Sequence, residues 1–509
     1  MMDAKNKYNY FFNSENVEVN LKEKSVRGGI ITTSTEAIVY ILRFGSIAIL
    51  ARILIPEHFG LIGMVTAVTA IAERFKDFGL GTATIQQKDI SHEQVSKLFW
   101  INLIIGMVLT IGFSLLSFPI AYFYDDTRLI WITIAISSSF AFSGLTIQHQ
   151  AILRRNLRFV ELGLIQIIST LLSLIIAVGM AVKGFGYWAL VWREVSRNVF
   201  IMAGTWIYCP WKPCLSTKNT KVSHLMKFGG DITGFNLINF FVRNLDQILI
   251  GKLFGAVELG FYRQGYQLVL LPIMQFIFPV NYVAEPTLSI LQREPLRYQK
   301  YYINITKILN MVSMPVVLFL VIYSKEIVLI ILGDQWLRAA DIFRFLAIAA
   351  FIKPAIGTTG FVMISCGQTR KYLILGVVNS ILLTCAICIG LLRGALGVAF
   401  GHVIYTYLWL LPQLYFSFKD TPVCIKDFFE AIRVPVLSSA VMFITIMTMK
   451  AFVSFQNSYL TVLTSLPVAL ASYLIIWLIT EDNRNYLKKI INDIIISVFK
   501  RNAYFIAKN

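Results

Sequence analysis

Charged residues and cysteines are scarce in this chain of 509 residues. The four charged residue types make up 15% of the sequence, whereas a soluble domain carries about 25%. Hydrophobic residues make up 57%, and the mean hydropathy is +0.67. The six cysteines imply no disulfide framework. This composition excludes a string of soluble domains and indicates that most of the length lies in lipid or between packed helices.

Motifs of nucleotide and metal chemistry are also missing. The chain has no Walker loop, no G-x-G-x-x-G and no nucleophile elbow. His92-Glu93 is not followed by a second histidine at the zincin position, and no Asp-x-Asp occurs, which disfavours a nucleotide-sugar transferase. We therefore expect no catalytic residue, no cofactor and no metal. Without a nucleotide site, any activity that needs energy would draw on ion gradients, the membrane potential or a substrate gradient.

Apolar runs recur along the chain, each long enough to cross about 30 Å of hydrocarbon. They predict an all-α polytopic membrane protein with about 14 transmembrane helices. The predicted spans begin near Gly29, Phe59, Leu98, Ile130, Val160, Gly186, Phe228, Gly260, Ile303, Ala339, Tyr372, Gly397, Ile432 and Tyr459.

The net charge of +18 does not indicate a nucleic-acid partner, because the cations lie in short loops between apolar runs. Most of the 46 basic residues fall in loops on the side of the N-terminus or in the two tails. The opposite loops hold only Arg52, Arg128, Lys183, Lys252, Lys325, Arg338, Arg393 and Lys450. This asymmetry predicts a plasma-membrane protein with both termini in the cytoplasm, and its basic clusters suit an anionic inner leaflet of membrane lipids. The N-terminal tail lacks the apolar core of a signal peptide.

An internal repeat aligns the chain with itself. At an offset of 200 residues Gly29 matches Gly229, Arg43 matches Arg243 and Gly60 matches Gly260; further on the offset drifts to about 211, where Gly186 faces Gly397. Six spans separate the copies, so we expect two pseudo-symmetric six-helix lobes in one orientation around a central cavity. The predicted parts are a flexible cytoplasmic tail (1–26), an N-terminal lobe (27–210), a linker (211–226), a C-terminal lobe (227–418), two extra helices (430–480) and an amphipathic tail (481–509).

Arginines within the spans are the first candidate site residues. Arg43 and Arg243 lie about halfway along the first span of each repeat, and ionisable residues at that depth usually face a cavity or a partner. Because the planar guanidinium suits phosphate, they predict a water-filled cationic cavity for an anionic group. The further candidates for this cavity are Arg74, Arg197 and Arg263.

Structural ion pairs remain an alternative for these cations. Arg74 could pair with Asp77 at i,i+3, and we interpret Arg193 and Lys353 as structural residues.

Acidic residues and prolines supply two further hypotheses. Glu36, Asp231 and Asp246 could bind a coupling proton or cation, or could neutralise the arginines. Pro272, Pro279 and Pro286 lie seven residues apart, on nearly one helix face, and indicate a bent helix that hinges or lines a cavity. A static kink is the alternative.

Short motifs along residues 24–480 carry a resemblance. They are Lys24-Ser25-Val26-Arg27-Gly28-Gly29, Leu50-Ala51-Arg52-Ile53-Leu54 with Phe59-Gly60, Phe78-Gly79-Leu80-Gly81, Asp246-Gln247-Ile248-Leu249-Ile250-Gly251, Leu259-Gly260-Phe261-Tyr262 and Gly333-Asp334-Gln335-Trp336. In order and spacing the chain resembles the polysaccharide transporter branch of the multidrug/oligosaccharidyl-lipid/polysaccharide exporter superfamily, of the Wzx and colanic-acid exporter type.

That resemblance implies a bacterial inner-membrane flippase for undecaprenyl-diphosphate-linked oligosaccharide, working by alternating access in surface polysaccharide biosynthesis. It implies a V-shaped cavity whose cations hold the diphosphate, a role carried over to Arg43 alone. The polymerase machinery for the polysaccharide is a further expected partner, and we expect a monomer. The alternatives are a cation-coupled multidrug antiporter of the same superfamily, a membrane glycan polymerase or ligase, and a lipid scramblase.

Overall fold

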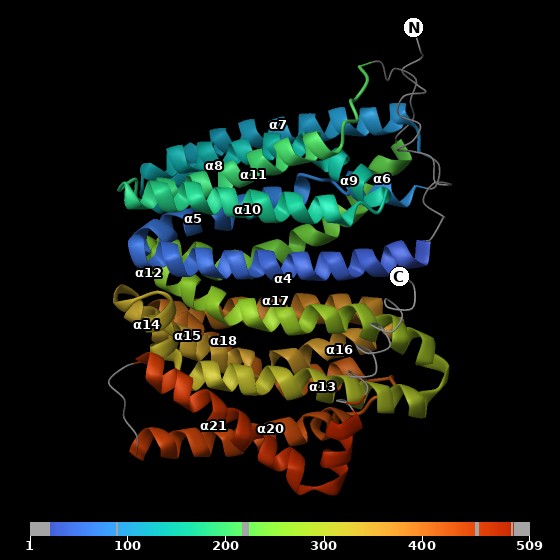
Figure 1. Ribbon diagram of the computed structural model, residues 1–509, viewed down its shortest axis with the longest axis vertical. Helices are drawn as coiled ribbons and strands as arrows, with labels where there is room; N and C mark the ends of the chain where they lie inside the picture. The colour runs from blue at the N-terminus through green and yellow to red at the C-terminus, as the bar shows by residue number, and fades with distance from the viewer. Residues whose placement is uncertain (1–20, 88–89, 216–222, 453–457, 490–491, 493–509) are drawn as a thin grey trace, which may run out of the picture. The chain divides into compact units, whose positions relative to one another are not determined.

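The computed structural model describes residues 21–87, 90–215, 223–452, 458–489 and 492. Within this part every regular element is a helix (Figure 1). The helices up to residue 208 are α4 (Leu21–Ile53), α5 (Pro56–Phe75), α6 (Leu80–Gln86), α7 (His92–Tyr124), α8 (Arg128–Gly144), α9 (Ile147–Arg155), α10 (Phe159–Val182) and α11 (Trp188–Tyr208).

The remaining helices follow a segment that includes residues 209–215. They are α12 (Ser223–Ile290), η1 (Leu291–Arg293), α13 (Pro295–Ile322), α14 (Ser324–Ile331), η2 (Asp334–Trp336), α15 (Leu337–Ala350), α16 (Lys353–Ser365), α17 (Thr369–Leu391), α18 (Gly394–Leu408), α19 (Leu410–Phe418), α20 (Ile425–Phe452) and α21 (Ser458–Ile479). The all-helical prediction is thereby confirmed for the described residues. Each predicted span begins within or directly beside one of these helices.

Seven stretches of helix in the described residues are long and apolar enough to cross a membrane. The number rises to nine if two bent pairs, α8 with α9 and α18 with α19, each form one span. The chain is therefore a multi-pass membrane protein, and the count of fourteen stays a prediction. α11 has the length of a span at 21 residues, but its middle carries the charged residues Arg193, Glu194 and Arg197.

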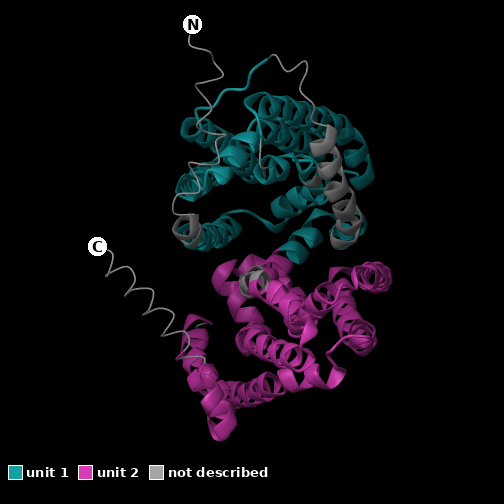
Figure 2. Ribbon diagram, turned by 90° about the vertical axis from the view of Figure 1, so that its right-hand side faces the viewer, with its two compact units in different colours: residues 1–263 teal, residues 264–509 magenta. Residues whose placement is uncertain are grey.

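Contacts divide the chain into two compact units, residues 1–263 and 264–509 (Figure 2). In the first unit α10 packs against both α4 and α11, and α7 packs against α8. In the second unit α17 packs against α18, and α13 packs against α20. The boundary falls inside α12, so the first unit includes α12 residues that the repeat assigns to the C-terminal lobe.

Local sequence signals set several helix ends. Ser91 and Gln94 form a capping box at the start of α7, in which each side chain bonds the other's backbone nitrogen. α12 departs from helical dihedrals at Gly255, whose φ of 79° is readily adopted by glycine. Across this break the Tyr262 hydroxyl donates a hydrogen bond of 2.6 Å to the buried carboxylate of Asp246.

Two glycines of the internal repeat meet where α5 crosses α12. A Cβ atom added to Gly60 would overlap the carbonyl oxygen of Ala256, and one added to Gly260 would overlap the carbonyl oxygen of Pro56. Pro56 and Ala256 are also 200 residues apart. The contact is therefore reciprocal, as an interface across a two-fold axis is. This crossing supports the repeat at a point where side chains larger than hydrogen do not fit.

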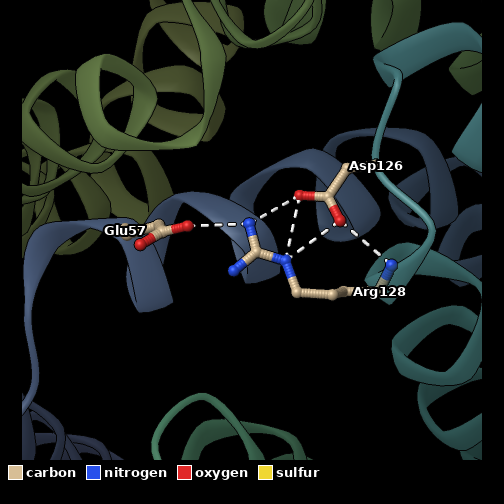
Figure 3. Close-up of polar contacts among 3 residues, drawn as sticks. All are labelled: Glu57, Asp126 and Arg128. Atoms are coloured by element: carbon tan, nitrogen blue, oxygen red, sulfur yellow. Dashed lines mark hydrogen bonds and ion pairs between the residues drawn. The ribbon is translucent and has the colours of Figure 1, made fainter.

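Ion pairs surround this crossing. Arg128 bonds Glu57 at the start of α5 and Asp126 in the turn after α7, at 2.7 Å in both cases (Figure 3). Lys252 of α12 pairs with Asp125 at 2.7 Å. Loop charges thus tie α5, α7, α8 and α12 together on one side of the first unit.

Candidate functional site

The middle of α11 concentrates charge in an otherwise apolar helix. Arg193 and Arg197 are four residues apart and therefore share one face, with Glu194 beside them. Arg197 Nη2 lies 3.3 Å from Glu194 Oε1, and Asn198 Nδ2 donates to the Glu194 backbone oxygen at 2.9 Å. All three charged side chains are half-buried. Glu194 thus holds one arginine of this face in an internal ion pair.

α4 joins this face of α11 through a polar contact. Arg193 Nη1 donates a hydrogen bond of 3.2 Å to Ser46 Oγ, which is buried one turn after Arg43. Arg43 is exposed at its side chain and lies within electrostatic range of Arg197, Glu194 and Glu36. The helix pair therefore brings together arginines that are 150 residues or more apart in the sequence.

α12 contributes a fourth arginine. Arg263 lies within electrostatic range of Arg193 and Glu194, and its Nη1 atom approaches Gly63 of α5. This Nη1 atom is buried and has no hydrogen-bond partner among the described residues. Leaving a charged donor unsatisfied in a protein interior is costly, so its retention favours a ligand that supplies the missing acceptor.

We call Arg43, Arg193, Arg197, Arg263 and Glu194 the cationic cluster. Glu36 is a second carboxylate within range of Arg43, and Lys76 is paired with Glu73. Among the described side chains, the four arginines therefore outnumber the two carboxylates within their range, Glu194 and Glu36. A multivalent anion with several oxygen acceptors, such as a diphosphate, would satisfy these donors.

Of the predicted site residues, Arg43, Arg197 and Arg263 each lie within electrostatic range of Glu194, and the cavity that they would line stays a prediction. The side chains of Arg74 and Arg243 lie outside the described residues. Sequence reasoning left Arg193 and Glu194 out of the candidate site. The i,i+4 spacing of Arg193 and Arg197 was the available signal, but it does not identify the helix that the shared face meets.

The proposed ion-coupling residues have different surroundings. Glu36 lines a small pocket of about 140 Å³ together with Gln150 and Arg154. Asp246 is buried and accepts the bond from Tyr262. The Asp231 side chain lies outside the described residues.

The three prolines of the hinge hypothesis lie in the part of α12 after its break at Gly255. Pro272 is half-buried and Pro286 is exposed, and the ring of Pro279 lies outside the described residues.

In the described part of the chain, no group of three His, Cys, Asp or Glu side chains could hold a metal ion.

Comparisons with known proteins bear on the family. Residues 49–341 match a family model described as "Polysaccharide biosynthesis protein". The teichuronic acid biosynthesis protein TuaB of Bacillus subtilis (strain 168) is 29% identical over 343 residues, which are 66% of this chain and 70% of TuaB. The lipopolysaccharide biosynthesis protein WzxC of Escherichia coli (strain K12) is 24% identical, over 76% of this chain and 79% of WzxC. The succinoglycan biosynthesis transport protein ExoT of Rhizobium meliloti (strain 1021) is 23% identical, over 70% and 72% of the two chains.

Solved structures share the fold. The lipid II flippase MurJ, in an inward closed conformation, superposes with a TM-score of 0.70 over 89% of this chain and 98% of MurJ, at 16% identity. An inward-facing multidrug transporter of the MATE family superposes with a TM-score of 0.56 over 74% and 93% of the two chains, at 14% identity. At such identities the likeness shows the fold and leaves the cargo to be argued from the site.

Proposed function

The chain belongs to the polysaccharide biosynthesis protein family, and from this premise we propose that it is a flippase for an undecaprenyl-diphosphate-linked oligosaccharide unit. It moves the unit from the cytoplasmic to the outer leaflet of the bacterial inner membrane by alternating access, in surface polysaccharide biosynthesis. Relatives named for lipopolysaccharide biosynthesis and for succinoglycan transport support this cargo class. The protein acts as a transporter without catalytic residues, in contact with the polymerase machinery and as a monomer.

The observation that carries the proposal is the cationic cluster. A diphosphate offers several acceptors, and Arg263 offers a buried donor without a partner among the described residues. Arginine binds phosphate oxygens through two parallel hydrogen bonds, which a flexible lysine does not provide as well. A cation-drug antiporter would need an excess of carboxylates at this place, where arginines are in excess among the residues that the structure describes.

Each member of the cluster has a role in the proposed cycle. Arg43 is exposed and makes first contact with the diphosphate, while Arg193 and Arg263 hold it deeper in the protein. Glu194 pairs with Arg197 in the empty site and releases it to the cargo. This exchange replaces one ion pair by another, so that the arginines are not left without a counter-charge at either stage.

The transmembrane arrangement belongs to the proposal as well. We infer fourteen spans in two six-helix lobes and two further helices, with both termini in the cytoplasm. In this orientation an inside-negative potential drives the anionic cargo outward. The free energy gained is about 2.3 kcal/mol per charge for each 100 mV of membrane potential. Glu36 and Asp246 bind a coupling ion only if this driving force is insufficient, and Pro272 and Pro286 form the hinge.

The test is the leaflet distribution of the lipid-linked oligosaccharide in cells depleted of the protein. We expect the intermediate to accumulate on the cytoplasmic side, and a copy with Arg263→Ala or Arg43→Ala to fail to clear it. Arg484→Ala, an exposed cation beyond the last span, is the control and should clear it. If the intermediate still reaches the outer leaflet and the cells become sensitive to cationic drugs, the antiporter replaces this proposal.

A further inference from the structure

An apolar groove runs between α17 and α18 in the second unit. Its volume is about 580 Å³, which is within the range of ligand sites in proteins. The floor is formed by small residues, and the walls are formed by larger apolar side chains. The floor residues are Ala386, Gly390, Gly397 and Gly401, and the walls include Leu382, Ile389, Phe400, Ile404 and Leu408.

Close approach of the two backbones creates this groove. A Cβ atom on Gly390 would lie 2.5 Å from the Gly397 carbonyl oxygen, and one on Gly401 would lie 2.6 Å from the Ala386 carbonyl oxygen. Small residues permit such contact between membrane helices. The larger side chains on either side of this backbone contact project beyond it and form the walls of the groove.

The groove faces outward from the helices. Ile389 is 70% exposed and Leu408 is 76% exposed. In α17 only 11% of the most apolar window is buried, so its surface is available to hydrocarbon. α18 has 15 residues and extends about 22 Å, a length that suits a fatty acyl chain better than a compact ligand.

One end of the groove is cationic. Arg393 is exposed in the turn between α17 and α18, and it lines the groove. Trp409 lines the other end, and its indole nitrogen donates a hydrogen bond of 2.6 Å to Asn379. A ligand that matches both ends has an anionic group joined to a long apolar chain.

We propose that this groove is a lipid site that holds one acyl chain of an anionic phospholipid, with the phosphate at Arg393. The guanidinium binds the phosphate and selects anionic over zwitterionic headgroups. The glycine floor accommodates the chain. The site shares no residue with the cationic cluster and does not depend on the proposed transport function.

Trp409 supplies the readout, because brominated acyl chains quench tryptophan fluorescence on contact. The protein is reconstituted in phosphatidylcholine vesicles that contain a small fraction of phosphatidylglycerol brominated on its acyl chain. Subtracting the signal of Trp409→Phe isolates Trp409 from the other tryptophans, of which the chain has nine in all. We expect brominated phosphatidylglycerol to quench Trp409 about fivefold more effectively than equally brominated phosphatidylcholine.

The variants decide the interpretation. Arg393→Gln should abolish the preference, whereas Lys183→Gln, an exposed cation at the corresponding turn between α10 and α11, should preserve it. Equal quenching by both lipids would overturn the proposal, as would a preference that survives Arg393→Gln. Recovery of fluorescence on adding a polyprenyl diphosphate, beyond that caused by the same amount of phosphatidylglycerol, would assign the groove to the polyprenyl chain instead and also overturn it.

Discussion

The predicted repeat aligns α11 with α18, yet the aligned residues are chemically opposite. At the offset of 211 residues Arg193 corresponds to Ile404, and Arg197 corresponds to Leu408. In α11 these positions hold two arginines of the cationic cluster, and in α18 they form part of the walls of the apolar groove. The two aligned helices thus present different surfaces, and the proposed anion site uses the charged one.

The two surfaces indicate what a charged helix needs from its neighbours. In α11 the charges meet Ser46 of α4 and the internal partner Glu194, which offset the cost of removing them from water. α18 shows isoleucine, tyrosine and leucine at the matching positions and lies against the sparsely buried α17. A charge is tolerated where a neighbouring helix supplies polar contacts and is excluded where hydrocarbon is the neighbour.

The largest effect should come from giving α11 the side chains of α18. Arg193→Ile with Arg197→Leu, made in the presence of Glu194→Gln so that no carboxylate loses its partner, should remove two of the proposed arginine–phosphate contacts. Each is worth about 1.5–3 kcal/mol, so we expect transport to fall by at least about a hundredfold. Flipping in proteoliposomes measures the loss, and Glu194→Gln alone is the control. Wild-type transport by the triple variant would remove α11 from the site.

The reverse exchange tests whether α18 can carry charge. Ile404→Arg places a guanidinium in the apolar groove, and a charge at the centre of a span costs about 2.5–3.5 kcal/mol. We expect a large drop in the yield of folded protein and in Tm, measured in detergent beside Ile404→Leu. An arginine variant as stable as the leucine variant would mean that water already reaches this groove.

Much of the site became interpretable only in three dimensions. The family and the helical class could be predicted, because apolar length and ordered motifs are properties of the sequence. The grouping of Arg43, Arg197 and Arg263 was a hypothesis based on depth in the membrane. The sequence favours a structural role for Arg193. Its contact with Ser46 depends on how α4 packs, and no spacing within α11 predicts that packing.

The crossing of α5 and α12 at Gly60 and Gly260 provides a test of the predicted repeat. Gly60→Ala and Gly260→Ala should each lower stability by about 1–3 kcal/mol, because their methyl groups overlap backbone oxygens. Gly45→Ala, whose added Cβ meets nothing within 4 Å, should stabilise by up to about 1 kcal/mol through helix propensity. Thermal unfolding measures all three. Unequal losses at the two repeat glycines would argue against the reciprocal contact.

The loop charges should produce the smallest effect. Burial alone would raise the pKa of Asp126, but hydrogen bonds and charge from Arg128 outweigh it and hold this pKa below its ordinary value. The stabilisation is therefore present above the unfolded pKa of about 3.9 and is lost as the pH falls through the folded value. For a partly exposed pair we expect about 0.2–1 kcal/mol. The decline of Tm between pH 5 and pH 2.5 should be shallower in Asp126→Asn, and an identical decline would refute the assignment.

The reciprocal meeting of Gly60 with Ala256 and of Gly260 with Pro56 has a consequence for how such a chain could arise. In a homodimer, residue i of one copy contacts residue j of the other, and residue j of the first copy contacts residue i of the second. The crossing of α5 and α12 has this pattern. A single ancestral half could have bound a second copy of itself through this patch before the two were fused. Fusion would leave the copies free to diverge, so that an arginine on one side need not appear on the other. A fused chain can carry an asymmetry such as that between α11 and α18, whereas a symmetric dimer of identical chains cannot.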